Sequence, residues 1–443
     1  MGYMNRNSRR PDEWASKSAH SNIIKDPAVV RFLDKCNLPK KASDVSFPSD
    51  QLIMYSPVSP QPITHIIAID GGYSEVPVQL EFPSATIAFF QFGALFFAME
   101  DLEKLEDVAF IDPEDISKLK QIERLKLTLP IKNITLKGEP GVKLSVRKTL
   151  YEFFSQTVEE GGLLESLDWF VFEHYNVTLS EWTLARCPIC DQSRVVLLRA
   201  DMSRDYTWSC PHCKGAVYLT DVFRLHEAID EELGAGGILG YLMTTIEQII
   251  LVHLVRIILK QKPGLLGQIL FVKDGPLGFF GQTANMHKPM RALVAWLLKK
   301  ENLFLVGLEK SGAFVEHAAE IATSLKDGTV LLLSNDYIYK YIVPGTADPA
   351  NPYGGTTYYG NKLIFKTPAG GLHVVTVPTG EIVTDPKPGD LRNLNVILSN
   401  VEKLRCDMYD NALVPVALVN KLVSLANHPS SKILQRFAME TLH

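Results

Sequence analysis

The sequence predicts an α/β protein in which helices flank a mixed β-sheet. From about residue 268 to residue 334, short apolar runs that fit strands alternate with longer segments whose apolar residues recur at helical spacing. A β-α-β-α-β order of this kind is typical of a sheet with helices on its faces. Upstream, segments 64–69, 73–82 and 85–97 predict a meander of strands, and segment 219–233 predicts a helix.

The charge distribution is local rather than global. The chain has 443 residues, which is enough for two or three domains, and a net charge of −5. This balance provides no overall attraction to nucleic acid, so any DNA contact must come from a basic patch. In segment 116–148, nine Lys or Arg residues stand against two Glu. That segment fits either a solvated helix face or a surface that tracks phosphates.

The longest apolar stretch, 238–259, does not fit a membrane span. It carries Glu247, His253 and Arg256, which would be costly at the centre of a bilayer. We therefore expect a buried helix. The first residues are polar and charged instead of resembling a signal peptide. Together these features predict a cytoplasmic protein with no membrane contact.

Four of the six cysteines form two CxxC pairs, which predict a zinc ribbon. Cys187 and Cys190 stand in CPIC, and after nineteen intervening residues Cys210 and Cys213 stand in CPHC. Four thiolates complete the tetrahedral shell of Zn²⁺, so the site would be structural. So few cysteines, paired in this way, indicate a reducing compartment rather than a disulfide framework. His212 lies inside the second pair and is expected on the surface.

Three acids in apolar surroundings are candidates for a second metal centre. Asp70 ends an apolar run in IIAIDGG, and Asp274 ends another in FVKDGPL. Each would stand at the tip of a buried strand, beside a glycine that lets a ligand come close. Glu247 lies in the long apolar helix, where an ionised carboxylate is costly unless it is paired or bound to metal. Carboxylate oxygens suit a hard cation such as Mg²⁺ or Mn²⁺.

Each candidate also has a simpler explanation. Glu247 could form a buried salt bridge to His253, Arg256 or a distant base. Lys310, at the end of a strand in GLEKSG, could neutralise a phosphate near the acids or be an ordinary surface lysine. Asp336 follows another apolar strand, so it is either a further strand-tip acid or a helix N-cap.

Carboxylates at the ends of adjacent strands, with one more from a helix, resemble the sites of RNase H-like nucleases. IDGG, a helical Glu, a strand ending in DGPL and a strand ending in GLEKSG follow one another here, and this ordered set resembles the NurA nucleases. The segment YYGNKLIFK…HVVTVP also resembles the C-terminal sheet of that family. The resemblance covers about residues 60–440 apart from the cysteine insert. It implies an RNase H-like fold in which Asp70, Glu247 and Asp274 bind the metal and Lys310 contacts phosphate.

The resemblance further implies a homodimer that cleaves single-stranded DNA and 5′ ends with Mn²⁺ or Mg²⁺. Its partner would be a hexameric HerA-type ATPase that pumps DNA, in DNA repair or antiphage defence. The chain departs from the family in two places: the CxxC…CxxC insert is unusual, and the C-terminal motif of an acid, a Pro and a His cannot be aligned securely. The fourth ligand therefore stays open among Asp336, Asp407, His428 and His443.

The expected organisation has four parts. These are an N-terminal arm and helix (1–60), the first part of a NurA-like nuclease domain (61–186), the zinc-ribbon insert (187–215), and the remainder of the nuclease domain with a C-terminal helical region (216–443). The competing hypothesis is a non-catalytic zinc-ribbon adaptor that binds and regulates a DNA translocase. Convergence of the acids distinguishes the two, because two-metal chemistry needs carboxylates close together.

Overall fold

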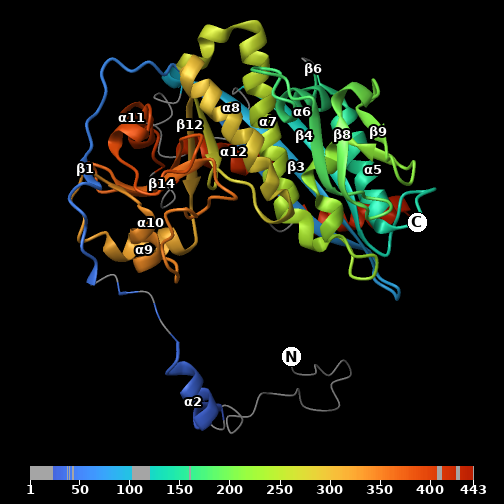
Figure 1. Ribbon diagram of the computed structural model, residues 1–443, viewed down its shortest axis with the longest axis horizontal. Coiled ribbons are helices and arrows are strands. Elements are labelled where there is room, and N and C mark those ends of the chain that lie inside the picture. The colour runs from blue at the N-terminus through green and yellow to red at the C-terminus, as the bar shows by residue number, and fades with distance from the viewer. Residues whose placement is uncertain are drawn as a thin grey trace.

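The chain folds around a mixed β-sheet with helices on both faces (Figure 1). The structure is a computed structural model, and it describes residues 23–36, 38, 40–41, 44–101, 120–158, 161–406, 412–425 and 430–442. A small unit of residues 181–218, the cysteine unit, carries four cysteines and packs against the helices on one face. The predicted mixed α/β fold with a cysteine-bearing insert is therefore confirmed.

The sheet joins segments that are far apart in the sequence. Neighbours are parallel only among the three central strands β12, β11 and β2, and the other neighbouring pairs are antiparallel. In spatial order the nine described strands are β1 (Leu52–Met54), β13 (Thr329–Leu332), β14 (Gly360–Lys366), β15 (Leu372–Pro378), β12 (Phe304–Glu309), β11 (Ile269–Asp274), β2 (His65–Gln79), β3 (Ala85–Ala98) and β4 (Lys120–Lys132).

Alternating side chains of the central strands form a separate core on each face of the sheet. Ile66 and Leu270 belong to the core on the first face, and Ile67 and Phe271 belong to the core on the second. The helices of the first face are α11 (Leu394–Lys403) and α12 (Val414–Val423). Those of the second are α5 (Val142–Ser155), α6 (Leu163–Val171), α7 (Leu239–Gln261) and α8 (His287–Lys300).

Smaller cores lie at the two ends of the sheet. At the β13–β15 end, Leu331 and Ile364 pack with α9 (Ala313–Ile321) and α10 (Asn335–Tyr341). At the other end, Ala438 of α13 (Ser430–Leu442) packs on the far half of β2 and β3. The β-α-β-α-β segment thus gives only a partly parallel sheet. The hairpin β14–β15 lies between β12 and β13, and the antiparallel pairings through it reverse β13 relative to β12.

The predicted strand meander is in fact one long hairpin. β2 continues without a break from His65 to Gln79 and pairs with β3 along its length. Asp70 therefore lies inside a strand rather than at its tip. It is nevertheless at the level where the neighbouring strand stops, because β11 makes its last pairing with β2 between Lys273 and Ile69.

The helix predicted for 219–233 does not form. The segment makes two short 3-10 turns, Leu219–Phe223 and Leu225–Ala228, on either side of Arg224. Arg224 has a φ of 61°, a left-handed conformation that ends one turn and starts the next. Its apolar neighbours are buried all the same, so helical spacing here reflects burial rather than a helix.

The helix α7 is the central helix of the second face. By length and composition alone, the stretch Gly236–Gln261 is apolar enough to cross a membrane, but most of it is buried inside the protein. Its buried side chains lie all round the axis between Thr245 and Val255. A helix that is apolar on all sides is expected in the core of a large domain, and this is the environment that surrounds Glu247.

Within the described residues of the N-terminal arm, the last part packs against the body. Helix α2 (Pro27–Leu33) has no buried residue and lies apart from the sheet in Figure 1. Further along, Val45 and Phe47 pack against the core beside α10, and β1 adds a strand to the edge of β13.

Candidate metal centres

The first candidate centre lies where the parallel strands end. Asp274 is the last residue of β11 and pairs in register with Leu308 of β12, while Asp70 is one residue beyond the last pairing of β2 with β11. Strand alternation sets the direction of both side chains. Ala68 and Val272, two residues earlier on each strand, pack in the core under α11 and α12. Asp70 and Asp274 therefore point toward the same face, from adjacent strands.

Glu247 approaches the same place from α7, on the opposite face. A Cβ added to Gly71 would lie 3.0 Å from Oε1 of Glu247 and 2.9 Å from the ring of Phe92. The missing side chain at Gly71 therefore makes room for the helix acid beside Asp70. The backbone N–H of Gly71 also donates to Oδ1 of Asp70 at 2.8 Å. The IDGG motif thus provides both an acid and the space for a second acid.

Two lysines neutralise the acids. The Lys310 ammonium donates to Oδ2 of Asp274 at 2.6 Å, and the Lys273 ammonium lies 2.8 Å from Oε2 of Glu247. Glu247 and Lys273 are each about 3% exposed. Lys273 is thus the distant base that a buried Glu247 needed. Lys273 was not among the predicted site residues, although a single lysine in an otherwise apolar strand is a signal for a buried ion pair.

The electrostatics of the acids reflect burial and crowding. Burial, together with the nearby charges of Glu247 and Asp274, raises the pKa of Asp70 to about 8. Burial also raises the pKa of Glu247, and the ion pair with Lys273 acts against this increase. Such perturbed carboxyl groups are common at functional sites, but structural ion-pair networks produce them too.

Asp336 lies away from these acids. β13 runs antiparallel to β12, so the carboxyl end of β13 lies at the same end of the strands as the start of β12. Asp274 and Lys310 lie at the opposite end of the strands, where β12 stops. Ser334 is the N-cap of α10 and accepts a hydrogen bond from the backbone N–H of Tyr337, so Asp336 is in the first turn, neither at a strand tip nor at the cap.

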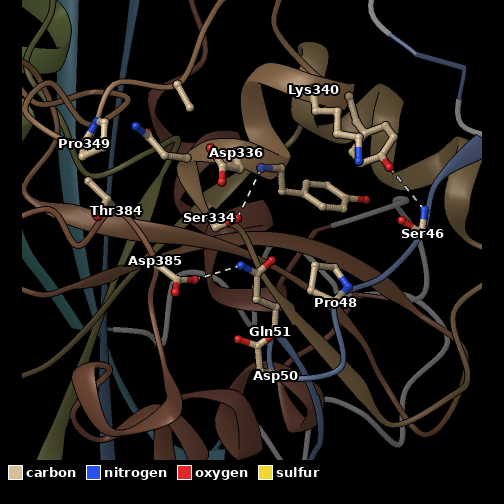
Figure 2. A pocket seen from close by; sticks show the side chains of 14 residues that line it. Ser46, Pro48, Asp50, Gln51, Ser334, Asp336, Lys340, Pro349, Thr384 and Asp385 are labelled. Carbon is tan, nitrogen blue, oxygen red and sulfur yellow. Dashed lines mark hydrogen bonds between the residues drawn. The ribbon is translucent and has the colours of Figure 1, made fainter.

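Asp336 instead lines a pocket of about 450 Å³ between α10 and the N-terminal arm. Figure 2 shows this pocket, with Gln51 bonded to Asp385 at its base. The other three candidates for a fourth ligand, Asp407, His428 and His443, lie outside the residues that the structure describes.

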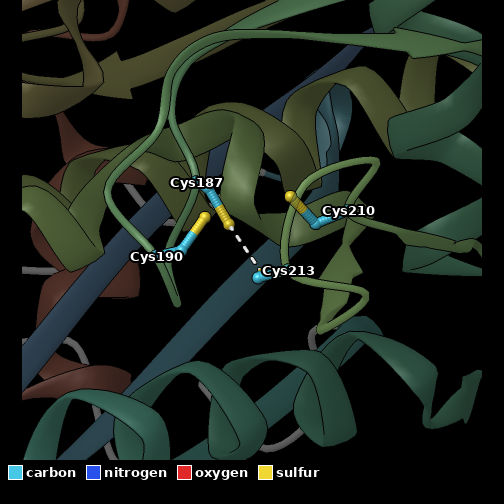
Figure 3. Close-up of side chains that lie close together, drawn as sticks. All are labelled: Cys187, Cys190, Cys210 and Cys213. Atoms are coloured by element: carbon cyan, nitrogen blue, oxygen red, sulfur yellow. Dashed lines mark hydrogen bonds between the residues drawn. The ribbon is translucent and has the colours of Figure 1, made fainter.

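The second candidate centre is the cysteine cluster (Figure 3). Its members are Cys187, Cys190, Cys210 and Cys213, whose sulfur atoms all lie within 4.8 Å of one another. Among the described residues, this is the group of three or more potential metal ligands that lie so close together. Each CxxC pair forms a turn closed by a backbone hydrogen bond, for example from the N–H of Cys210 to the carbonyl of Gly215. The predicted four-cysteine site is therefore present, and it could hold a zinc ion.

Short strands frame the cluster. Hairpin β7–β8 (Glu181–Arg186 and Ser193–Leu198) carries the first pair, and hairpin β9–β10 (Thr207–Ser209 and Ala216–Tyr218) carries the second. A further short pair, β5–β6 (Thr157–Val158 and Gly161–Gly162), precedes α6. His212 is exposed and is not part of the cluster.

Buried charges tie the cysteine unit to α5. Arg147 makes two hydrogen bonds to Asp221, at 2.8 and 2.7 Å, and a third to the carbonyl of Ala216 on β10. Arg199 bonds Asp168 of α6 at 3.0 Å. Arg199, one of the basic residues of this unit, therefore holds the unit to the helices.

These observations define a class: a mixed α/β domain with acids at the end of its parallel strands and a four-cysteine insert. A family model described as NurA domain matches residues 64–261, which include Asp70, the cysteine unit and Glu247. This region of the chain therefore matches the NurA domain family.

Two solved structures resemble the chain at low sequence identity. One is the crystal structure of the NurA nuclease from Sulfolobus solfataricus, with 6% identity, 97% coverage of both chains and a TM-score of 0.34. Another is a crystal structure of NurA with manganese, with 10% identity, 94% coverage of both chains and a TM-score of 0.27. A comparison with curated proteins finds no match.

Proposed function

We propose that this chain is a metal-dependent deoxyribonuclease whose centre is built from Asp70, Glu247 and Asp274. The observation that carries the proposal is that these acids, which are far apart in the sequence, lie at one end of the parallel strands, where the charges of Glu247 and Asp274 both act on Asp70. Buried acids near one another are unfavourable in a purely structural role unless each is paired, because each added charge raises the cost of the others.

The residues fit a hard divalent cation. The donors are carboxylate oxygens, which Mn²⁺ and Mg²⁺ prefer, and Gly71 leaves the space through which Glu247 reaches the strand. When bound, such an ion activates water and stabilises the leaving oxygen of a phosphodiester. Lys310 then has a second role beside Asp274, where its ammonium can bind the scissile phosphate.

A nuclease assay on the whole chain tests the proposal. We expect cleavage of single-stranded and blunt double-stranded DNA with Mn²⁺ or Mg²⁺, and none with EDTA. Asp70→Asn and Asp274→Asn should each abolish cleavage, since a neutral amide is a poor ligand for a hard cation. Lys366→Met, on β14 and away from the acids, is the control and should cut like the unmodified chain. Full activity in both acid variants would reject the site.

The finer activity and the partners are further proposals from the family resemblance. We propose a cytoplasmic homodimer that cuts single strands internally and degrades 5′ ends. Its partner would be a HerA-type hexameric ATPase, in DNA repair or antiphage defence. Co-purification with the ATPase and a rise in cleavage upon ATP addition would support the partnership. The adaptor hypothesis would be favoured if the unmodified chain did not cut DNA and if it and Asp70→Asn stimulated the ATPase equally.

We also propose that the four cysteines bind a structural Zn²⁺. Four sulfur ligands complete the tetrahedral shell and leave no position for a substrate or a water. In the proposed domain organisation, this insert interrupts a nuclease domain that consists of residues 61–186 and 216–443.

A further inference from the structure

We propose that Lys273 is a positioning residue that aims Glu247 at the acid centre. The inference rests on the proposed function, because it assigns a role within the same centre. Lys273 immediately precedes Asp274 on β11, but strand alternation turns its side chain to the other face, toward α7. The two consecutive residues thus serve one centre from the two faces of the sheet.

The ammonium of Lys273 connects the helix acid to the strand. It donates to the backbone carbonyl of Asp274 at 2.7 Å and lies 2.8 Å from Oε2 of Glu247. This carbonyl belongs to Asp274, which carries the neighbouring acid. The lysine therefore links Glu247 to the backbone at the end of β11. A Lys–carboxylate contact with a second bond to the backbone has a fixed geometry.

The two oxygens of Glu247 consequently have different surroundings. Oε2 is held by Lys273, while Oε1 faces Gly71, the residue after Asp70. One oxygen is therefore anchored and the other is directed to the strand that carries the neighbouring acid. Outer partners of this type orient metal ligands in proteins, and their loss typically lowers metal affinity or activity by about 10- to 100-fold.

Burial gives the contact its importance. Lys273 and Glu247 are almost completely inaccessible to water, so water cannot easily replace a lost ammonium. In Lys273→Met, the helix acid would lose its anchor, and its free oxygen would no longer be directed to Gly71. We expect Mn²⁺ affinity, measured by calorimetry on the full chain, to fall at least about tenfold. kcat should also fall, while KM for DNA should stay the same.

Two further variants separate positioning from general stability. Lys366→Met is matched in chemistry, because Lys366 also joins backbone carbonyls to a carboxylate, those of Ala322 and Leu325 to that of Asp327. It should leave Mn²⁺ affinity within twofold of the unmodified chain. The double variant Glu247→Gln/Lys273→Met buries no lone charge, so it should fold even if Lys273→Met does not. If Lys273 acts through Glu247, the double variant binds Mn²⁺ like Glu247→Gln alone.

The results distinguish the two proposals. Unchanged or tighter Mn²⁺ binding by Lys273→Met, or a further tenfold loss in the double variant relative to Glu247→Gln, would overturn the positioning role. If either of these results is obtained while the unmodified chain binds Mn²⁺ and cuts DNA, the proposed nuclease function is retained and only the role of Lys273 is rejected. If the unmodified chain neither binds Mn²⁺ nor cuts DNA, both proposals fail.

Discussion

At the scale of single residues, the fold opposes the ionisation of Asp70. Its pKa is about 8 in the folded chain and about 4 in an unfolded one. A carboxyl group with a raised pKa favours folding while it is protonated, and this contribution is lost as pH rises through the folded pKa. In EDTA, we therefore expect the free energy of unfolding to decrease between about pH 4 and pH 8 because of Asp70.

The measurement is urea unfolding across that pH range for the unmodified chain and Asp70→Asn. The stability advantage of the asparagine variant should increase with pH and level off above about pH 8. A constant difference would show that Asp70 is not perturbed. A metal that binds the ionised carboxylate competes with the proton, so Mn²⁺ affinity of the unmodified chain should increase over the same range.

Gly71 provides a second prediction at this scale. An alanine Cβ would lie 3.0 Å from Oε1 of Glu247 and 2.9 Å from a ring carbon of the buried Phe92. We expect Gly71→Ala to lower both the melting temperature and the Mn²⁺ affinity, since the acid must move away from the strand.

Gly240→Ala is the matched control for that substitution. Gly240 is near the start of α7, is exposed, and has open space around its Cα. Alanine there should stabilise the helix by up to about 1 kcal/mol and leave Mn²⁺ affinity unchanged. Equal Mn²⁺ affinity in the two glycine variants would contradict the close approach between Gly71 and Glu247.

At the scale of elements, the cysteine unit is part of the core rather than a loosely attached module. Cys187 and Trp208 belong to the same hydrophobic core as α5 and α7. We therefore expect Cys187→Ser to reduce bound zinc from about one per chain toward zero, as the ligand set is incomplete, and also to lower the melting temperature. Elemental analysis and thermal unfolding measure the two effects. Cys36→Ser, at an exposed cysteine, should change neither, and unchanged zinc in Cys187→Ser would contradict the site.

The elements also show what the sequence could and could not predict. The hairpin β14–β15, the helix around Glu247 and the cysteine pairs follow from local patterns, namely apolar alternation, helical spacing and CxxC spacing. The continuity of β2 through Gly71 and Gly72 does not. It depends on pairing with β3, and glycine locally favours a break as much as a strand.

The candidate acids of the proposed centre could be selected from the sequence in the same way. Asp70, Glu247 and Asp274 were recognisable because each is an acid in an apolar segment. The partner of Glu247 was not, since Lys273 lies 26 positions away and meets it only when β11 packs beneath α7. Pairings of this kind depend on the order of strands in the sheet, which a local pattern does not contain.

At the scale of the whole molecule, the N-terminal arm divides into a part that the body needs and a part that it does not. Helix α2 has no buried residue, so α2 itself contributes nothing to the core. In contrast, Val45 and Phe47 pack beside α10, and β1 covers the edge of β13. Its removal would leave an unpaired strand edge, which favours aggregation.

We therefore expect a chain that starts at residue 37 to melt within about 2 °C of the full chain, because α2 has no buried residue to lose. A chain that starts at residue 56 should melt at a lower temperature and form aggregates, as measured by differential scanning fluorimetry and light scattering. Nuclease activity per folded molecule should be unchanged in the chain that starts at residue 37, since the acids and α10 lie at opposite ends of the strands. A large loss of stability on removing residues 1–36 would mean that α2 is covered in solution, and the size of the assembly before and after truncation would then show whether a second copy covers it.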